Sequence, residues 1–345
     1  MRFELLVLGS SAAMPTATRF CSGQLLRVQS THVLIDCGEG SLRQLQAAGA
    51  GYGRISLILI THLHGDHYFG LPGLLTSFSL NDRKKPLTIV SPPGLKERIG
   101  PLIETQNYSM PFDIEFVELA LPALEAQSAI SAEDSEASSS THQPKEEADA
   151  FPKFLFTHSG LSIHYFPLDH RVPTAGYLLT EIQKQPNIIP EQIERHRIPY
   201  TKIRDIKAGA DFETEAGETI PHDQLVTSAP EPRSFAYCSD TRYMPQLAEW
   251  VKGVDLLYHE ATFLHELVER AEYTKHSTAR EAAQIAREAQ VGKLIIGHFS
   301  SRYTRSEVLV DEARTIFSET VAARELERHI VPARTRRSGD RSDLD

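Results

Sequence analysis

The chain is poor in cysteine and has no long apolar run, and each shortage excludes a class of protein. The three cysteines among 345 residues, Cys21, Cys37 and Cys238, lie too far apart for a zinc knuckle and are an odd number for a disulfide framework. We expect them to be buried, reduced thiols. No stretch approaches the roughly 20 apolar residues that span a bilayer. The first residues resemble a strand rather than a secretion signal, so the sequence predicts a cytoplasmic protein.

An excess of basic charge is also lacking, because 46 Asp and Glu outnumber 36 Lys and Arg and give a formal net charge of −10. Proteins that coat nucleic acid normally gather Lys and Arg, so this balance argues against that class. The charge is uneven, however. Residues 125–150 carry seven acidic side chains and one lysine, whereas residues 195–207 carry five Lys or Arg and one aspartate. A nucleic-acid substrate that meets only one face of the protein therefore remains open.

No period of 20–50 residues recurs, which excludes a repeat protein. Apolar strand-like runs alternate instead with helical stretches, as is typical of an α/β domain. Residues 123–152 lack an apolar period and predict a disordered acidic insertion, and residues 332–345 predict a flexible tail. The other expected elements include strands over 2–8, 24–28, 55–60, 87–90 and 114–119 and helices over 41–48, 71–80, 95–104 and 302–323.

Residues 60–72 are dense in groups that bind metal. They read Ile-Thr-His-Leu-His-Gly-Asp-His-Tyr-Phe-Gly-Leu-Pro and begin where the apolar run 55–60 ends. A strand that ends in a glycine-bearing loop can turn several side chains towards one point. Nitrogen and oxygen ligands of this density suit zinc or a similar divalent metal, whereas solvated loop histidines are the alternative. The candidate ligands are His62, His64, Asp66 and His67.

Three further apolar runs end in a potential ligand. Asp240, His259 and His298 each follow such a run. A single histidine after a strand is usually structural, but ligands in open α/β sheets gather outside the carboxyl ends of the strands. Because several such positions occur in one chain, we expect them to lie near the histidine loop.

The pattern His62-x-His64-x-Asp66-His67, followed by an isolated His170, Asp240 and His298, resembles the metallo-β-lactamase superfamily. Within it, the chain is similar to the ribonuclease Z family, endonucleases that remove the 3′ trailer from precursor tRNA. The similarity runs from residue 6 to about residue 303. Beyond the loop it is carried by His259-Glu-Ala-Thr-Phe263, Lys275-His-Ser-Thr-Ala279 and His298-Phe-Ser-Ser-Arg-Tyr303.

This resemblance implies a single α/β domain over residues 1–331, a metallo-β-lactamase αββα sandwich with a substrate-binding arm inserted at about 181–228. It also implies two Zn²⁺ per subunit, although such ligands accept Mn²⁺ or Fe²⁺ as well. Asp36 would orient a ligand histidine, or alternatively cap the helix that follows it. Asp240 would bridge the two metals, whose other implied ligands are His62, His64 and His170 for one and Asp66, His67 and His298 for the other.

Phosphodiester hydrolysis suits such a centre, because two metals can activate water and neutralise charge on an anionic substrate. The resemblance gives Asp66 a second role as acceptor of the proton of the attacking water. His276 is the candidate donor of a proton to the leaving 3′-oxygen, and Glu260 is expected to orient it. Arg302 is a candidate phosphate clamp, since guanidinium matches phosphate bidentately; an ordinary surface arginine is the alternative.

The chain departs from the family in two places. Residues 15–20 belong to the loop that helps family members to sense the end of tRNA, and here Ala17 and Phe20 replace a lysine and an asparagine while Arg19 is kept. The arm lacks the usual Gly-Pro-rich segment and is basic instead. Arg19, Lys202 and Arg204 are candidate substrate contacts, with ordinary surface as the alternative for the arm.

The leading hypothesis is a cytoplasmic, zinc-dependent endoribonuclease that acts on precursor tRNA and leaves a 3′-hydroxyl on the tRNA. The resemblance implies a homodimer. The acidic charge and the altered loop at 15–20 favour instead a hydrolase of a small ester, sulfate ester or cyclic nucleotide. An inactive binding subunit would be expected to have lost ligands, and all seven are present.

Overall fold

The computed structural model describes residues 2–104, 110–122 and 151–332. The predicted insertion at 123–152, apart from Phe151 and Pro152, and the predicted tail beyond residue 332 lie outside these ranges. The described residues divide into two compact units, one made from the ranges up to residue 179 with residues 234–332, and the other of residues 180–233. Every helix in the described ranges is too short or too polar to cross a membrane.

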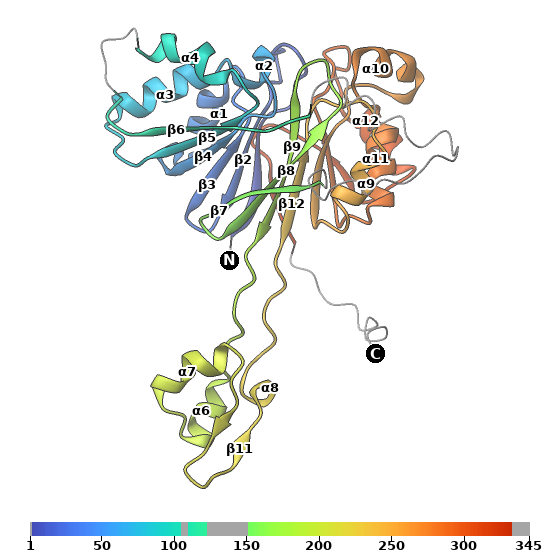
Figure 1. Cartoon of the computed structure of the whole chain (residues 1–345). Coiled ribbons are helices and arrows are strands. Elements are labelled where there is room, and N and C mark those ends of the chain that lie inside the picture. Colours follow the sequence, from blue (N-terminus) through green and yellow to red (C-terminus); the bar gives the residue numbers. More distant parts are fainter. Residues whose placement is uncertain (1, 105–109, 123–150, 333–345) are drawn as a thin grey trace, which may run out of the picture. The chain divides into compact units, whose positions relative to one another are not determined.

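Two sheets, each of seven strands within the described ranges, form the centre of the first unit (Figure 1). The first sheet has the order β16-β1-β2-β3-β4-β5-β6, and the second β15-β14-β13-β12-β9-β8-β7. The first comprises β1 (Phe3–Gly9), β2 (Gly23–Val28), β3 (Thr31–Ile35), β4 (Ile55–Leu59), β5 (Leu87–Ser91), β6 (Ile114–Glu118) and β16 (Arg328–Ile330). The second comprises β7 (Lys153–His158), β8 (Leu161–Leu168), β9 (Thr174–Glu181), β12 (Ser234–Cys238), β13 (Leu256–Glu260), β14 (Leu294–Gly297) and β15 (Thr320–Ala322).

Apolar side chains form a core on both faces of each sheet. One cluster joins residues of both sheets and therefore lies between them, with Tyr177, Tyr237 and Tyr258 as its largest members. A second packs α1 (Ser41–Ala47), α3 (Leu71–Leu80) and α4 (Leu95–Glu104) against the first sheet. A third packs α9 (Leu247–Trp250), α11 (Ala279–Glu288) and α12 (Glu307–Arg314) against the second. This arrangement confirms the predicted αββα sandwich.

The predicted terminal helix over 302–323 is wrong in extent. Only Glu307–Arg314 is helical, and Thr320–Ala322 forms β15, which pairs in parallel with β14 through Leu294↔Thr320 and Ile296↔Ala322. The β-branched Thr320 and Val321 suit a strand. The partner strand lies about 26 residues earlier in the chain, and a local helical pattern carries no information about it.

The second unit has a small core of its own. It consists of α6 (Pro190–His196), α7 (Tyr200–Lys207), α8 (His222–Leu225) and the short hairpin of β10 (Phe212–Glu213) and β11 (Thr219–Ile220). Ile206, Phe212 and Leu225 are among the buried side chains that hold these elements together. The predicted arm at 181–228 falls within this unit, and its role as a substrate-binding arm stays a prediction.

Candidate metal centre

The histidine loop follows β4 and is partly helical, which the sequence did not predict. His62 and His64 leave the strand in extended backbone, and α2 (Gly65–Tyr68) then turns Asp66 and His67 back towards them. A Cβ atom at Gly65 would lie 2.3 Å from the ring of Phe69, so a larger residue here would displace that exposed side chain. The four predicted ligands of the loop therefore face one region.

Three imidazoles meet at the first half of the centre. The Nδ1 atom of His64 lies 3.1 Å from Nε2 of His62 and 3.2 Å from Nε2 of His170. Burial lowers the pKa of all three, to about 4 for His170. His170 donates its other ring hydrogen, on Nδ1, to the carbonyl of Lys275 at 2.9 Å. His170 therefore turns the lone pair of its Nε2 atom towards His64, an orientation that suits a shared cation.

The second half contains Asp66, His67 and His298. The Nδ1 atom of His67 lies 2.8 Å from Asp36 Oδ2, and that of His298 lies 3.0 Å from Thr262 Oγ1. The Nε2 atoms of both histidines are buried and have no hydrogen-bond partner among the described residues. They lie 3.4 and 3.6 Å from Asp66 Oδ2. A buried polar atom without a partner is costly, and a metal ion is the partner that this geometry fits.

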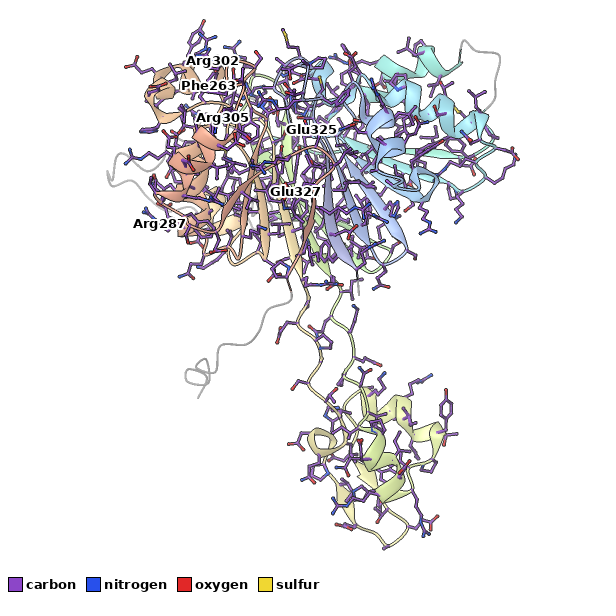
Figure 2. All side chains as sticks on the ribbon, turned by 180° about the vertical axis from the view of Figure 1, so that it is seen from behind. Phe263, Arg287, Arg302, Arg305, Glu325 and Glu327 are labelled. Atoms are coloured by element: carbon purple, nitrogen blue, oxygen red, sulfur yellow. The ribbon has the colours of Figure 1, made fainter. Side chains whose placement is uncertain are left out.

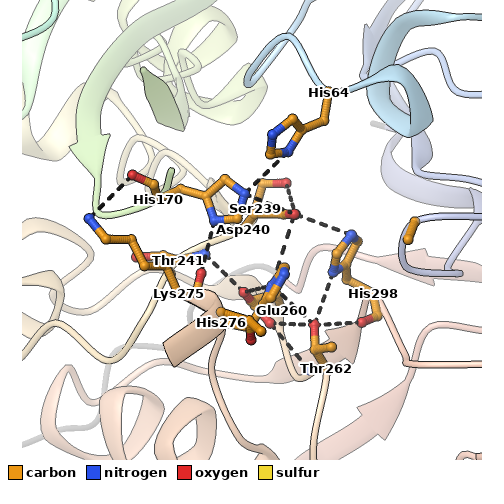
Figure 3. A network of polar contacts seen from close by, with 12 residues as sticks. His64, His170, Ser239, Asp240, Thr241, Glu260, Thr262, Lys275, His276 and His298 are labelled. Carbon is orange, nitrogen blue, oxygen red and sulfur yellow. Dashed lines mark hydrogen bonds and ion pairs between the residues drawn. The ribbon is translucent and has the colours of Figure 1, made fainter. Parts of the chain in front are cut away.

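Asp240 joins the two halves (Figure 3). Its Oδ1 lies 3.4 Å from His67 Nε2 and 3.2 Å from His298 Nε2. Its Oδ2 lies 3.7 Å from His62 Nε2 and 3.8 Å from His170 Nε2. One carboxylate oxygen thus faces each set of imidazoles, which is the arrangement of a bridging ligand.

The electrostatics favour positive charge at this point. Burial alone would lower the pKa of His67, but the carboxylates of Asp240, Asp66 and Asp36 outweigh it and raise the pKa well above its usual value. Within each proposed set, the ligand atoms lie within 4.8 Å of one another. Buried imidazole nitrogens and carboxylate oxygens so arranged fit a divalent metal.

Asp36 contacts His67, the histidine that it is positioned to orient. Its side chain is fully buried and also accepts hydrogen bonds from the backbone N–H of Thr61 at 2.9 Å and from Thr61 Oγ1 at 3.0 Å. The alternative role as a helix cap is wrong. The N-cap of α1 is Gly40, and no described side chain caps that helix end.

His276 and Glu260 form a hydrogen-bonded pair beside the ligands (Figure 3). His276 Nδ1 lies 2.8 Å from Glu260 Oε1, and Thr241 N–H and Thr262 Oγ1 donate to the same buried carboxylate. Burial would lower the pKa of His276, but Glu260 raises it to about 9. A protonated imidazole is therefore expected near neutral pH, with Nε2 free of this bond.

Asp169 is a residue of the site that sequence reasoning missed. It is fully buried, and its carboxylate lies 2.6 Å from Lys275 Nζ and 2.5 Å from Arg242 Nε. These contacts tie together the segments that carry His170, Asp240 and His276. The only sequence feature that pointed to Asp169 was its position next to His170. Its pairing with Lys275 and Arg242, which are distant in sequence, leaves no local pattern.

The other predicted site residues lie away from the ligands. The guanidinium of Arg302 stacks over the ring of Phe263 at 5.2 Å (Figure 2). Arg19 is largely buried against Phe299 and donates to the carbonyl of Tyr303. Among the described residues, neither lines the cavity of about 430 Å³ over the metal ligands. Lys202 and Arg204 are exposed on α7 of the second unit, and His259 lies within β13 outside the ligand sets.

The chain is similar along most of its length to known proteins. A family model described as "Beta-lactamase superfamily domain" matches residues 186–299, and one described as "Anti-Pycsar protein Apyc1" matches residues 3–100. A ribonuclease Z of Bacteroides thetaiotaomicron is 39% identical over 324 residues, which cover 94% of each chain. A ribonuclease Z of Cytophaga hutchinsonii is 38% identical over 321 residues, covering 93% of each chain.

A solved structure supports the same relationship. The crystal structure of human tRNase Z, short form, has a TM-score of 0.65 and 25% sequence identity, and the match covers 95% of this chain and 99% of that one. A metallo-β-lactamase fold protein of Bacillus subtilis, with a TM-score of 0.63 and 16% identity over 96% of this chain and 100% of that one, shares the fold. On the identity and coverage of its relatives, and with the ligand geometry in agreement, the chain belongs to the ribonuclease Z family of the metallo-β-lactamase superfamily.

Proposed function

We propose that this protein is a metal-dependent endoribonuclease that removes the 3′ trailer from precursor tRNA. Cleavage would leave a 3′-hydroxyl on the tRNA and a 5′-phosphate on the trailer. The observation that carries the proposal is the convergence of the predicted ligands and His276 at one cavity in a chain of the ribonuclease Z family. The relatives named above favour this activity over hydrolysis of a small ester.

The centre is proposed to hold two Zn²⁺. His62, His64 and His170 would bind one ion, Asp66, His67 and His298 the other, and Asp240 both. Bound metals of this kind activate water near neutral pH and neutralise charge on the phosphate. The two oxygens of Asp240, each directed at one histidine set, support two ions rather than one.

Asp66 and His276 are proposed to move the protons of the reaction. Burial alone would raise the pKa of Asp66, but His67 and His298 hold it well below its usual range, so the carboxylate is anionic. Its place among the cavity-lining residues supports its proposed role as proton acceptor. His276 would donate from Nε2 to the leaving 3′-oxygen. Glu260 supports this role, because its bond to Nδ1 fixes the ring and favours the protonated form.

Substrate binding is proposed to involve regions outside the cavity. Lys202 and Arg204 present exposed positive charge on α7, which suits contact with an RNA backbone. Arg302 and Arg19 remain candidate contacts from the resemblance. A homodimer and a cytoplasmic location are part of the same proposal, and light scattering of the purified protein tests the first.

Cleavage of a precursor tRNA by the zinc-loaded protein tests the function. We expect a single cut immediately after the discriminator base, and loss of that cut in Asp66→Ala. A second substrate with an encoded CCA tests whether the altered loop at 15–20 still senses the tRNA end. Hydrolysis of a small phosphodiester without any cut in the precursor would overturn the proposal.

A further inference from the structure

The ring of Tyr273 lies beside Arg171, a residue that lines the cavity, and it has no part in the roles proposed so far. Tyr273 belongs to the last turn of α10 (Val268–Thr274), and 81% of its surface is exposed. The next residue, Thr274, lines the cavity together with His276. Tyr273 is therefore close in sequence to the proposed proton donor and directly precedes a residue of the cavity wall.

Arg171 places a positive charge beside this ring. Its Nη2 atom donates to the carbonyl of Tyr273 at 3.1 Å, and its Cζ lies 5.6 Å from the centre of the ring. Arg171 also lines the cavity and directly follows the proposed ligand His170. A guanidinium thus lies over a largely exposed aromatic ring at the edge of the residues that line the cavity.

The backbone that carries Tyr273 is held in place. Lys275 ends α10 with φ of +55°, and His276 N–H donates to the carbonyl of Ala271 at 2.8 Å. The ammonium group of Lys275 pairs with buried Asp169. A backbone fixed in advance loses little freedom on binding, which favours affinity.

We propose that Tyr273 and Arg171 bind one unpaired nucleotide adjacent to the scissile phosphodiester, with Tyr273 stacking on its base and Arg171 pairing with its phosphate. This inference rests on the proposed function, because it needs a single-stranded RNA segment at the metal centre. Stacking on an aromatic side chain accepts any base, since every base has a π-face. A base-paired nucleotide has both faces covered, so the pair selects a substrate whose cleavage site is unpaired.

The test compares Tyr273→Ala, Tyr273→Phe and the wild-type protein on three precursor tRNAs. One is intact, one is abasic at the first trailer nucleotide, and one is abasic at the discriminator. Phe154→Ala is the matched control, because Phe154 is another exposed aromatic residue of the first unit, on β7. Metal content and melting temperature establish that each variant is folded and loaded.

On the intact precursor we expect Tyr273→Ala to raise KM by about 10- to 100-fold, with kcat within twofold of wild type. Tyr273→Phe and Phe154→Ala should behave as wild type. On one of the two abasic substrates the KM of the wild type should rise to that of Tyr273→Ala on the intact precursor. The KM of Tyr273→Ala should be the same on that abasic substrate as on the intact precursor.

Three results would overturn the inference. The first is a KM of Tyr273→Ala within twofold of wild type on the intact precursor. The second is an equal rise in KM for the variant and the wild type on both abasic substrates. The third is loss of bound metal from Tyr273→Ala, which would reveal a structural role. If the wild-type protein fails to cut the intact precursor, the proposed function falls as well, which distinguishes the two failures.

Discussion

At the scale of single residues, the orientation of each reactive imidazole depends on the nitrogen that faces away from the cavity. His67 is held by Asp36, His298 by Thr262 and His276 by Glu260, each through Nδ1 at 2.8 to 3.0 Å. Partners of this kind fix the ring and raise its basicity as a ligand. The same geometry leaves Nε2 of His67 and His298 available for metal, and Nε2 of His276 available to carry a proton.

Replacement of His276 tests this division of roles. We expect His276→Ala to lower kcat for precursor tRNA by roughly 10²- to 10⁴-fold, the range for loss of one acid–base group, with metal content unchanged. His158→Ala is the control, because His158 is half-buried and bonded to Ser56 in β4. Loss of bound metal in His276→Ala would instead identify this residue as a ligand.

His32 makes stability depend on pH. It is buried in β3, and burial together with nearby Arg27, Arg54 and Arg2 lowers its pKa to about 4. In the unfolded chain the pKa of His32 is near 6.5, so between pH 4 and pH 6.5 the unfolded chain binds a proton at His32 and the folded protein does not. Stability is therefore fully present at neutral pH and falls as the pH drops through this window.

We expect His32→Gln to weaken that dependence. Between pH 7 and pH 5 the free energy of unfolding of the wild type should fall by about 2 kcal/mol more than that of the variant. Denaturant unfolding of both proteins at the two pH values, at equal metal content, measures the difference. An equal fall in the free energy of unfolding of the two proteins would show that the folded state accommodates a protonated His32 ring.

At the scale of elements, the ends of parallel strands bring together side chains that lie far apart in sequence. Strands β12, β13 and β14 are parallel neighbours, and the chain supplies Asp240, Glu260 and His298 at their carboxyl ends. Asp169 then connects the loops between them through Lys275 and Arg242. The site is thus a property of one sheet edge and the loops that leave it.

Residues 180–233 are the element whose function is easiest to isolate. Glu181 and Arg233 lie side by side, with the N–H of Glu181 donating to the carbonyl of Arg233 at 2.9 Å and the two side chains paired at 2.8 Å. Replacing residues 184–230 by a short Gly-Ser linker should therefore leave the sandwich intact. We expect hydrolysis of a small phosphodiester within threefold of wild type and cleavage of precursor tRNA reduced at least 100-fold.

Lys202→Ala/Arg204→Ala provides the graded comparison for that deletion. Loss of two phosphate contacts should weaken precursor binding and reduce its salt dependence, without any effect on the small phosphodiester. Full precursor cleavage after the deletion would show that this unit is ordinary surface.

At the scale of the whole molecule, the metal centre joins the two sheets. The ligands of residues 62–67 follow β4 of the first sheet, whereas His170, Asp240 and His298 follow strands of the second. Burial of apolar side chains between the sheets already holds the halves together. A metal bound by residues of both sheets would add a second connection, and it would stabilise only the folded chain.

Removal of metal should therefore lower the melting temperature. A ligand present at 100 times its Kd adds about 2.7 kcal/mol to folding, which for a domain of this size corresponds to a shift of roughly 4–5 °C. We expect a chelator to produce such a shift in the wild type and little change in Asp240→Asn. Identical melting curves with and without chelator would contradict a metal that bridges the sheets.

The sequence by itself determined the fold class, the metal-binding character of the loop and most of the side chains that carry the chemistry. Strand periodicity and the spacing of His62, His64, Asp66 and His67 are local properties, so they can be read from neighbouring residues. His276 and Glu260 came from the family resemblance, and the structure places them 2.8 Å apart.

Only the tertiary structure decided how these groups act on one another. The two-sided contacts of Asp240, the buried pairing of Asp169 with Lys275 and Arg242, and the exposed ring of Tyr273 beside Arg171 all join residues that are far apart in sequence. Strand β15 was misread as helix for the same reason. Distances of this kind depend on sheet pairing and side-chain packing, which a local sequence pattern does not contain.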